Sequence, residues 1–110
     1  MKLPNAERAI VADLKLTGYL LSTTHKEGKG KASVFFSHGF HLEFADKLRK
    51  ALKKVAISNP VSKSFETEHG MKFVIEGLLE TQDGRRIFLR TIWMIDPGGT
   101  IPHLVSAYPL

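Results

Sequence analysis

The sequence predicts an α+β fold in which about three N-terminal helices pack on a four-stranded antiparallel meander sheet. Apolar residues follow a helical period in the first half and an extended pattern in the second half, where turn signals separate the extended runs. At 110 residues, 43% of them hydrophobic, the chain fits a single domain, 1–110. Its helical half covers about 1–58 and its sheet half about 61–108.

The helical half is divided by residues that begin and end helices. Asp13 is a suitable N-cap for a short helix that ends near Ser22, and a second short helix is expected from about Lys29 to Ser37. The third helix has the clearest period, with one apolar stripe formed by Phe44, Leu48, Ala51, Leu52 and Val55.

The sheet half is divided by three turn signals, which are Glu68-His69-Gly70, Gln82-Asp83-Gly84-Arg85 and Asp96-Pro97-Gly98-Gly99. Strands are expected between them, at about 61–67, 71–81, 86–95 and 101–108. Because each connection is short, neighbouring strands should run antiparallel, and no βαβ unit is available for a parallel nucleotide-binding sheet.

The positive charge is concentrated in the first half. Residues 1–55 carry eleven Lys and Arg against five Asp and Glu, whereas residues 56–110 carry five against six, which gives the net charge of +5. Such an excess attracts polyanions. Lysines 47, 50 and 54 lie opposite the apolar stripe of the third helix, where a solvated face is the favoured interpretation and nucleic-acid contact the less favoured one.

The composition excludes several kinds of site. Without cysteine the chain has no disulfide, thiolate metal ligand or cysteine nucleophile. The five histidines show no HExxH pattern, so we expect neither a metal site nor a cofactor. Apolar runs are only a few residues long and the start lacks a signal-peptide core, so we expect a cytoplasmic protein without membrane contact.

The segment Gly28-Lys29-Gly30-Lys31 is rich in glycine and lysine but lacks the spacing of a Walker phosphate loop. It is either an anion site at a helix start, with Lys31 as a cation, or a flexible basic loop. His25 lies just before it, in a loop where a side chain can be presented to a substrate. A surface histidine without function is the alternative interpretation.

Arg90 is a charged residue within a strand that is otherwise apolar. In the simplest register it lies opposite Gly77 and near Ser106, with Tyr108 on the same face, and it points toward the helical side. The same parity places Glu76 on the opposite face, outside this group. A slip of one residue would instead group Arg90 with His103 or Ala107. An arginine that reaches solvent at a sheet edge is the alternative.

Several motifs resemble those of a bacterial domain-of-unknown-function family over essentially the whole chain. They are Lys2-Leu3-Pro4-Asn5-Ala6-Glu7-Arg8-Ala9, Leu16-Thr17-Gly18-Tyr19-Leu20-Leu21-Ser22 with His25, Lys31-Ala32, Phe35-Phe36, Gly39-Phe40, Arg90-Thr91-Ile92-Trp93 and Leu104-Val105-Ser106-Ala107-Tyr108-Pro109. The pattern is also similar to the C-terminal modules of bacterial polymorphic toxins, within the barnase, EndoU, colicin and RelE-like ribonuclease superfold. That superfold has N-terminal helices followed by a four-stranded antiparallel sheet.

The resemblance implies a metal-independent endoribonuclease of toxin type, which cleaves RNA by attack of the ribose 2′-OH on the phosphodiester. Together with loop position and strand parity, it implies His25 as the general base or acid. Arg90 and Lys31 would hold the phosphate and its developing charge. Ser106 and Tyr108 would position the phosphate, or Tyr108 would stack on a base.

The resemblance also implies a protein partner, since a toxin needs a small antitoxin or immunity protein, expected to be acidic. The competing function is a binding module without catalysis, one half of a toxin-antitoxin-like pair. Simple RNA or DNA binding is a third possibility and predicts a steep dependence of affinity on salt.

Overall fold

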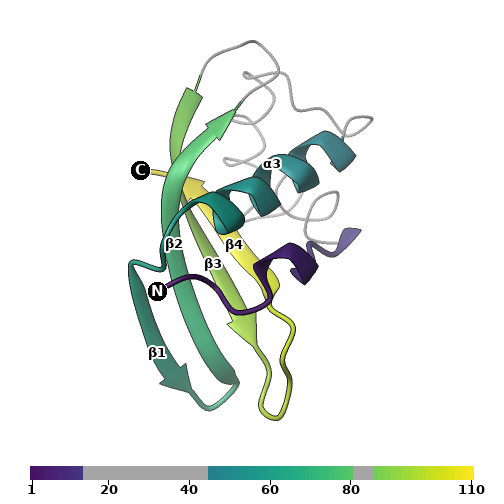
Figure 1. The fold of residues 1–110 in the computed structure, drawn as a ribbon, viewed down its shortest axis with the longest axis vertical. Coiled ribbons are helices and arrows are strands. Elements are labelled where there is room, and N and C mark those ends of the chain that lie inside the picture. The colour runs from purple at the N-terminus through teal and green to yellow at the C-terminus, as the bar shows by residue number, and fades with distance from the viewer. Residues whose placement is uncertain (14–44, 81–85) are drawn as a thin grey trace, which may run out of the picture.

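The computed structural model describes residues 1–13, 45–80 and 86–110 of the chain. In chain order they form the 3-10 helix η1 (Ala6–Arg8), the α-helix α3 (Ala45–Ser58) and the strands β1 (Lys63–Thr67), β2 (Gly70–Glu80), β3 (Arg86–Ile95) and β4 (His103–Pro109). The strands form an antiparallel sheet in the order β1-β2-β3-β4, and α3 and η1 lie on one of its faces (Figure 1).

The four-stranded antiparallel meander expected from the turn signals is present. Two of the expected turns lie within the described residues, and both are closed by hydrogen bonds. In the first, the Thr67 hydroxyl donates to the carbonyl of Gly70 (2.8 Å) and accepts from the N–H of His69 (3.1 Å). In the second, the N–H of Gly99 donates to the carbonyl of Asp96 (2.8 Å). The expected turn at 82–85 lies outside the described residues.

The expectation of about three N-terminal helices is wrong. The helical elements whose bounds lie within the described residues are α3, which follows the expected apolar stripe, and the three-residue η1. The first described residues form an arm that contains η1 and bonds to the sheet through its backbone. The expected helices near 13–22 and 29–37 lie outside the described residues. None of the helices in the described part has the length and hydropathy that crossing a membrane requires.

The N-terminal arm, residues 1–11, is held at both of its ends by backbone hydrogen bonds. At one end Val61 donates to the carbonyl of Met1 (2.6 Å). At the other end Ile10 donates to Pro102 (2.9 Å) and accepts from Leu104 (2.9 Å), which makes a parallel bridge beside β4. The arm, which contains η1, therefore crosses the helix side of the sheet (Figure 1).

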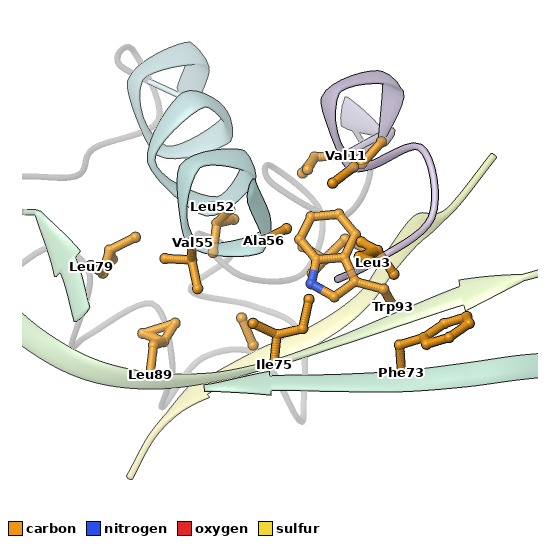
Figure 2. Close-up of a cluster of buried hydrophobic side chains, with 14 of the residues drawn as sticks. Leu3, Val11, Leu52, Val55, Ala56, Phe73, Ile75, Leu79, Leu89 and Trp93 are labelled. Atoms are coloured by element: carbon orange, nitrogen blue, oxygen red, sulfur yellow. The ribbon is translucent and has the colours of Figure 1, made fainter. Parts of the chain in front are cut away.

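The core lies between α3, the arm and the inner face of the sheet. In Figure 2, Leu52 and Val55 of α3 point toward the sheet. Trp93 is fully buried beside Leu3 and Val11 of the arm. Alternate residues of β2 and β3 contribute to this face, as the period of an extended chain requires. The sheet is therefore covered on one side by α3 and the arm.

Gly77 is a close-packing position on β2. A Cβ atom at Gly77 would overlap Nδ2 of Asn59, which itself donates to the carbonyl of Val55 in the last turn of α3 (2.9 Å). The sequence placed Arg90 opposite this glycine, but the room that Gly77 leaves is taken by Asn59. The absence of a side chain at residue 77 thus leaves room for Asn59, at the end of α3, to lie directly on the sheet.

Replacing Gly77 by alanine is expected to lower the free energy of unfolding by about 1–3 kcal/mol, because the added methyl group overpacks the contact with Asn59. Urea unfolding followed by circular dichroism measures the change. The variant Asn59→Ala combined with Gly77→Ala should lose less than the sum of the two single losses, since the clash disappears with the amide. Additive losses would contradict the proposed contact.

Candidate functional site

The sheet face opposite α3, here called the open face, carries the even-numbered residues of β2 and β3. Ile75, Leu79 and Leu89 are fully buried on the inner face, so Glu76 and Arg90 lie on the open face. Both are partly exposed, with 29% and 38% of their side-chain surfaces accessible. The charged residues Glu76 and Arg90 of these two strands therefore lie on the face that α3 does not cover.

The strand register places three polar residues in a row across the open face. Arg90 on β3 lies opposite Glu76 on β2 and opposite Tyr108 on β4. The expected pairing of Arg90 with Gly77 is wrong by one residue, because Gly77 lies opposite Leu89 on the inner face. Arg90 therefore points away from α3. Its neighbour is Glu76, which the sequence had placed outside the candidate site.

An irregularity in β3 and β4 keeps Ser106 on the open face. Ile92 lies opposite Ser106, whereas the next residue, Trp93, lies opposite Leu104, so the register shifts between them. Ser106 and Tyr108 consequently share a face with Arg90. Arg90 faces Tyr108 directly, and Ser106 lies two residues further along the strand.

The Arg90 side chain is held by both neighbours. Its Nε and Nη2 donate to the same oxygen of Glu76, Oε2, at 3.0 and 2.8 Å. Its Nη1 lies 3.5 Å from the hydroxyl of Tyr108, a long hydrogen bond, and the guanidinium carbon lies 5.8 Å from the centre of the Tyr108 ring. The hydrogen bond with Tyr108, and then that with Glu76, raises the pKa of Arg90, which stays cationic at any working pH.

The contacts of Arg90 with Glu76 and Tyr108 leave hydrogen-bond donors and one acceptor available to a ligand. A guanidinium has five N–H groups, and these contacts use the Nε–H, one N–H of Nη2 and one of Nη1. One N–H on each terminal nitrogen of Arg90 is not used by these contacts, and a guanidinium N–H is a good donor to a phosphate oxygen. Because Arg90 engages only Oε2 of Glu76, the other oxygen, Oε1, is not part of this pair and can accept a proton.

A shallow groove of about 440 Å³ extends from this row across the open face. We call it the Arg90 groove, and its described lining consists of Ser62, Lys63, Phe65, Val74, Glu76, Arg90, Ile92 and Tyr108. Val74 and Ile92 lie opposite one another and form its apolar middle. The groove combines two cations, one carboxylate and two aromatic rings, a composition that fits an anion attached to a flat apolar group.

Two of the residues expected in the site, His25 and Lys31, lie outside the described residues. The two histidines that the structure describes are placed elsewhere: His69 is near Glu68 (3.4 Å) in a turn, and His103 contacts Asp96 (3.0 Å). Within residues 1–13, 45–80 and 86–110 there is no cluster of three potential metal ligands. The described part of the candidate site is thus Arg90, Ser106 and Tyr108, with Glu76 added.

A second hollow, of about 680 Å³, lies between α3 and the end of β2, and its described lining includes Lys47, Lys50 and Lys54. Lys54 is bound there by Glu80 at 3.1 Å. At this end of β2 the basic helix face meets acidic side chains. The positive charge of this helix face is therefore partly balanced, whereas Arg90 keeps N–H donors available for a ligand.

A family model described as Domain of unknown function (DUF6883) matches residues 2–110. The chain belongs to the DUF6883 family. This confirms the expected membership of a domain-of-unknown-function family, while the ribonuclease superfold stays a prediction. The search of curated proteins found no match for this DUF6883 chain.

Among solved structures, the DUF6883 chain is similar to a chain of a contact-dependent growth inhibition toxin–immunity protein complex from Klebsiella pneumoniae 342. The TM-score is 0.72 and the sequence identity is 14%, with 92% of this chain and 99% of that chain covered. At this identity the likeness shows a shared fold. It extends over nearly the whole of both chains.

Proposed function

We propose that this DUF6883 domain is a toxin-type, metal-independent endoribonuclease that cleaves RNA by attack of the ribose 2′-OH on the phosphodiester. The observation that carries the proposal is the group of Glu76, Arg90 and Tyr108 on the open face. In this group the Glu76 carboxylate is a proton acceptor, and the adjacent Arg90 guanidinium is a cation with two further N–H donors. The fold shared with a chain of a toxin–immunity complex supports the toxin assignment.

The reaction needs a base, stabilisation of the negative charge on phosphorus, and an acid. Oε1 of Glu76 takes the proton of the 2′-OH, the 2′-oxygen bonds to phosphorus, and the remaining N–H groups of Arg90 bind two non-bridging oxygens. The bond from phosphorus to the 5′-oxygen then breaks, and an acid protonates that oxygen, leaving a 2′,3′-cyclic phosphate and a 5′-OH. In this proposal His25 is the acid, and Lys31 and Ser106 help to hold the phosphate.

A toxin of this kind requires a protective partner, and we propose a small acidic protein for this role. The net charge of +5 favours association with an acidic surface. The structural neighbour is described as a toxin–immunity protein complex, which supports the same kind of partner. A protein that covers the Arg90 groove would block the access of RNA to Arg90.

Incubating the purified protein with a tRNA mixture in excess EDTA tests the reaction. We expect fragments that end in 2′,3′-cyclic phosphates. The variant Glu76→Gln should cleave about 10²–10⁴-fold more slowly, because the amide keeps the shape of the side chain but accepts no proton. Glu80→Gln is the matched control, since Glu80 lies on the same strand and face but is bound by Lys54, and it should cleave at the wild-type rate.

The outcomes separate the roles of the residues. Wild-type cleavage by Glu76→Gln, with loss of cleavage in His25→Ala, would assign the base to His25 instead. Absence of cleavage by the wild-type protein would overturn the ribonuclease proposal. RNA or partner binding without strand scission would then favour the alternative, a binding module of a toxin–immunity pair, which the structural neighbour also supports.

A further inference from the structure

We propose that the Arg90 groove holds an unpaired nucleotide next to the scissile phosphate, so that the substrate is single-stranded or looped RNA. The inference rests on the proposed function for the identity of the polymer. It adds Lys63 and Phe65 of β1 to the site, and these residues are distant from Arg90 in the sequence.

The register places the groove residues in two rows. At the level of Arg90 the row runs from Glu76 through Arg90 to Tyr108. Two residues further along each strand, the next row on this face runs from Lys63 through Val74 and Ile92 to Ser106. Neighbouring strands lie about 4.8 Å apart, so four strands span roughly 14 Å. This width accommodates a nucleotide lying across the apolar middle of the groove.

Phe65 is an aromatic residue that folding leaves available. It lies on the open face of β1, two residues from Lys63, and 42% of its surface is exposed. Phe65 and Tyr108 therefore provide ring surface on opposite sides of the groove, with Val74 and Ile92 between them. Aromatic rings on a sheet surface stack on nucleobases, and every base has a face that can be stacked.

The charges of the groove complement a nucleotide as well. Lys63 and Arg90 are cations on two different strands, and one carboxylate, Glu76, is paired with Arg90. The groove therefore keeps a net positive charge beside its apolar middle. A phosphate on Arg90 and a neighbouring phosphate near Lys63 would leave the base between them over Val74 and Ile92.

This arrangement discriminates against a duplex. In paired RNA the bases stack on one another, and a protein reaches mainly the backbone and the shallow minor groove. Phe65 can contact the face of a base only when that base is unstacked. The aromatic residues thus predict a preference for unpaired RNA, whereas a cationic site alone would bind both forms through their phosphates.

Binding of 2′-O-methyl RNA tests the groove without cleavage, because this RNA has no 2′-OH to attack. We expect a fluorescein-labelled single-stranded 12-mer to bind more tightly than a self-complementary duplex of the same composition. Phe65→Ala should weaken single-strand binding by about 5- to 150-fold. Phe65→Tyr should restore binding, which shows that a lost ring, and not a damaged fold, causes the defect.

Phe88→Ala is the matched control. Phe88 lies on the same sheet face and is 50% exposed, but it lies outside the lining of the Arg90 groove. Its replacement should change the affinity less than twofold. Equal losses for Phe65→Ala and Phe88→Ala, equal affinity for duplex and single strand, or no loss for Phe65→Ala would each overturn the proposal.

The same preparation separates this inference from the proposed function. Groove-dependent binding of 2′-O-methyl RNA together with no cleavage of ordinary RNA would overturn the ribonuclease and retain the nucleotide site. Cleavage of ordinary RNA that is unaffected by Phe65→Ala would retain the ribonuclease and overturn the site. Tight binding of an acidic partner through Phe65, with no RNA affinity, would assign the groove to the partner and overturn the site as well.

Discussion

Replacing Arg90 by alanine is expected to lower the rate of RNA cleavage by about 10²–10³-fold. The two N–H groups that Arg90 leaves unused would bind the non-bridging oxygens as negative charge develops, and loss of such donors costs rates of this size. The contact with Glu76 at 2.8 Å also disappears, which leaves the proposed base without the cation that orients it. Single-turnover cleavage of a defined RNA, with enzyme in excess, measures the chemical step.

Two further variants test whether the loss of cleavage is specific to the Arg90 guanidinium. Arg86→Ala removes another arginine from the same strand and the same face, at the pair with Glu80, and should retain wild-type cleavage. Arg90→Lys keeps the charge but not the planar pair of donors, so it should recover only part of the rate. Wild-type cleavage by a folded Arg90→Ala protein would remove Arg90 from the mechanism.

The sheet was predictable because its signals are local. Each turn contains residues that favour turns, and the described turns at Thr67 and Asp96 are closed by short-range hydrogen bonds. Between the turns the runs of apolar residues along β2 and β3 indicate strands, although they do not by themselves show which face is buried. The existence and the order of the strands are therefore determined by residues that are close together in the sequence.

The N-terminal region was not predictable in the same way. Residues 1–11 bond to Val61, Pro102 and Leu104, which are about 50 to 100 residues away in the sequence. The helices expected from the sequence begin at Asp13, and the local pattern of residues 1–11 carries no information about a sheet edge that needs a partner. The arm is thus an example of tertiary contacts that decide local conformation.

The candidate site shows how sensitive a functional inference is to register. Side chains alternate between faces, so an error of one residue at the turn between β2 and β3 moved Arg90 to the wrong face and excluded Glu76. The correct pair was detectable as opposite charges, Glu76 and Arg90, on consecutive strands. Had that attraction been used to set the register, Gly77 would have been assigned to the inner face, where it packs against Asn59.

Replacing Trp93 by alanine is expected to lower the free energy of unfolding by about 3–5 kcal/mol. Trp93 is fully buried at the junction of the arm and the sheet, so removing the ring leaves a cavity that the arm and the strands cannot both close. The marginal stability of domains of this kind, about 5–15 kcal/mol, makes this a large fraction of the total. Urea unfolding monitored by circular dichroism measures the loss.

The buried hydrogen bonds around Trp93 allow a sharper comparison. Its Nε1 donates to the hydroxyl of Thr91 (2.9 Å), which in turn donates to the carbonyl of Ile75 (2.8 Å). Trp93→Phe keeps most of the apolar contact and removes one donor, while the Thr91 hydroxyl retains its acceptor. It should therefore lose only about 1–2 kcal/mol. A loss in Trp93→Phe as large as that in Trp93→Ala would show that the hydrogen-bond chain, and not the packing of the ring against the arm, stabilises this part of the fold.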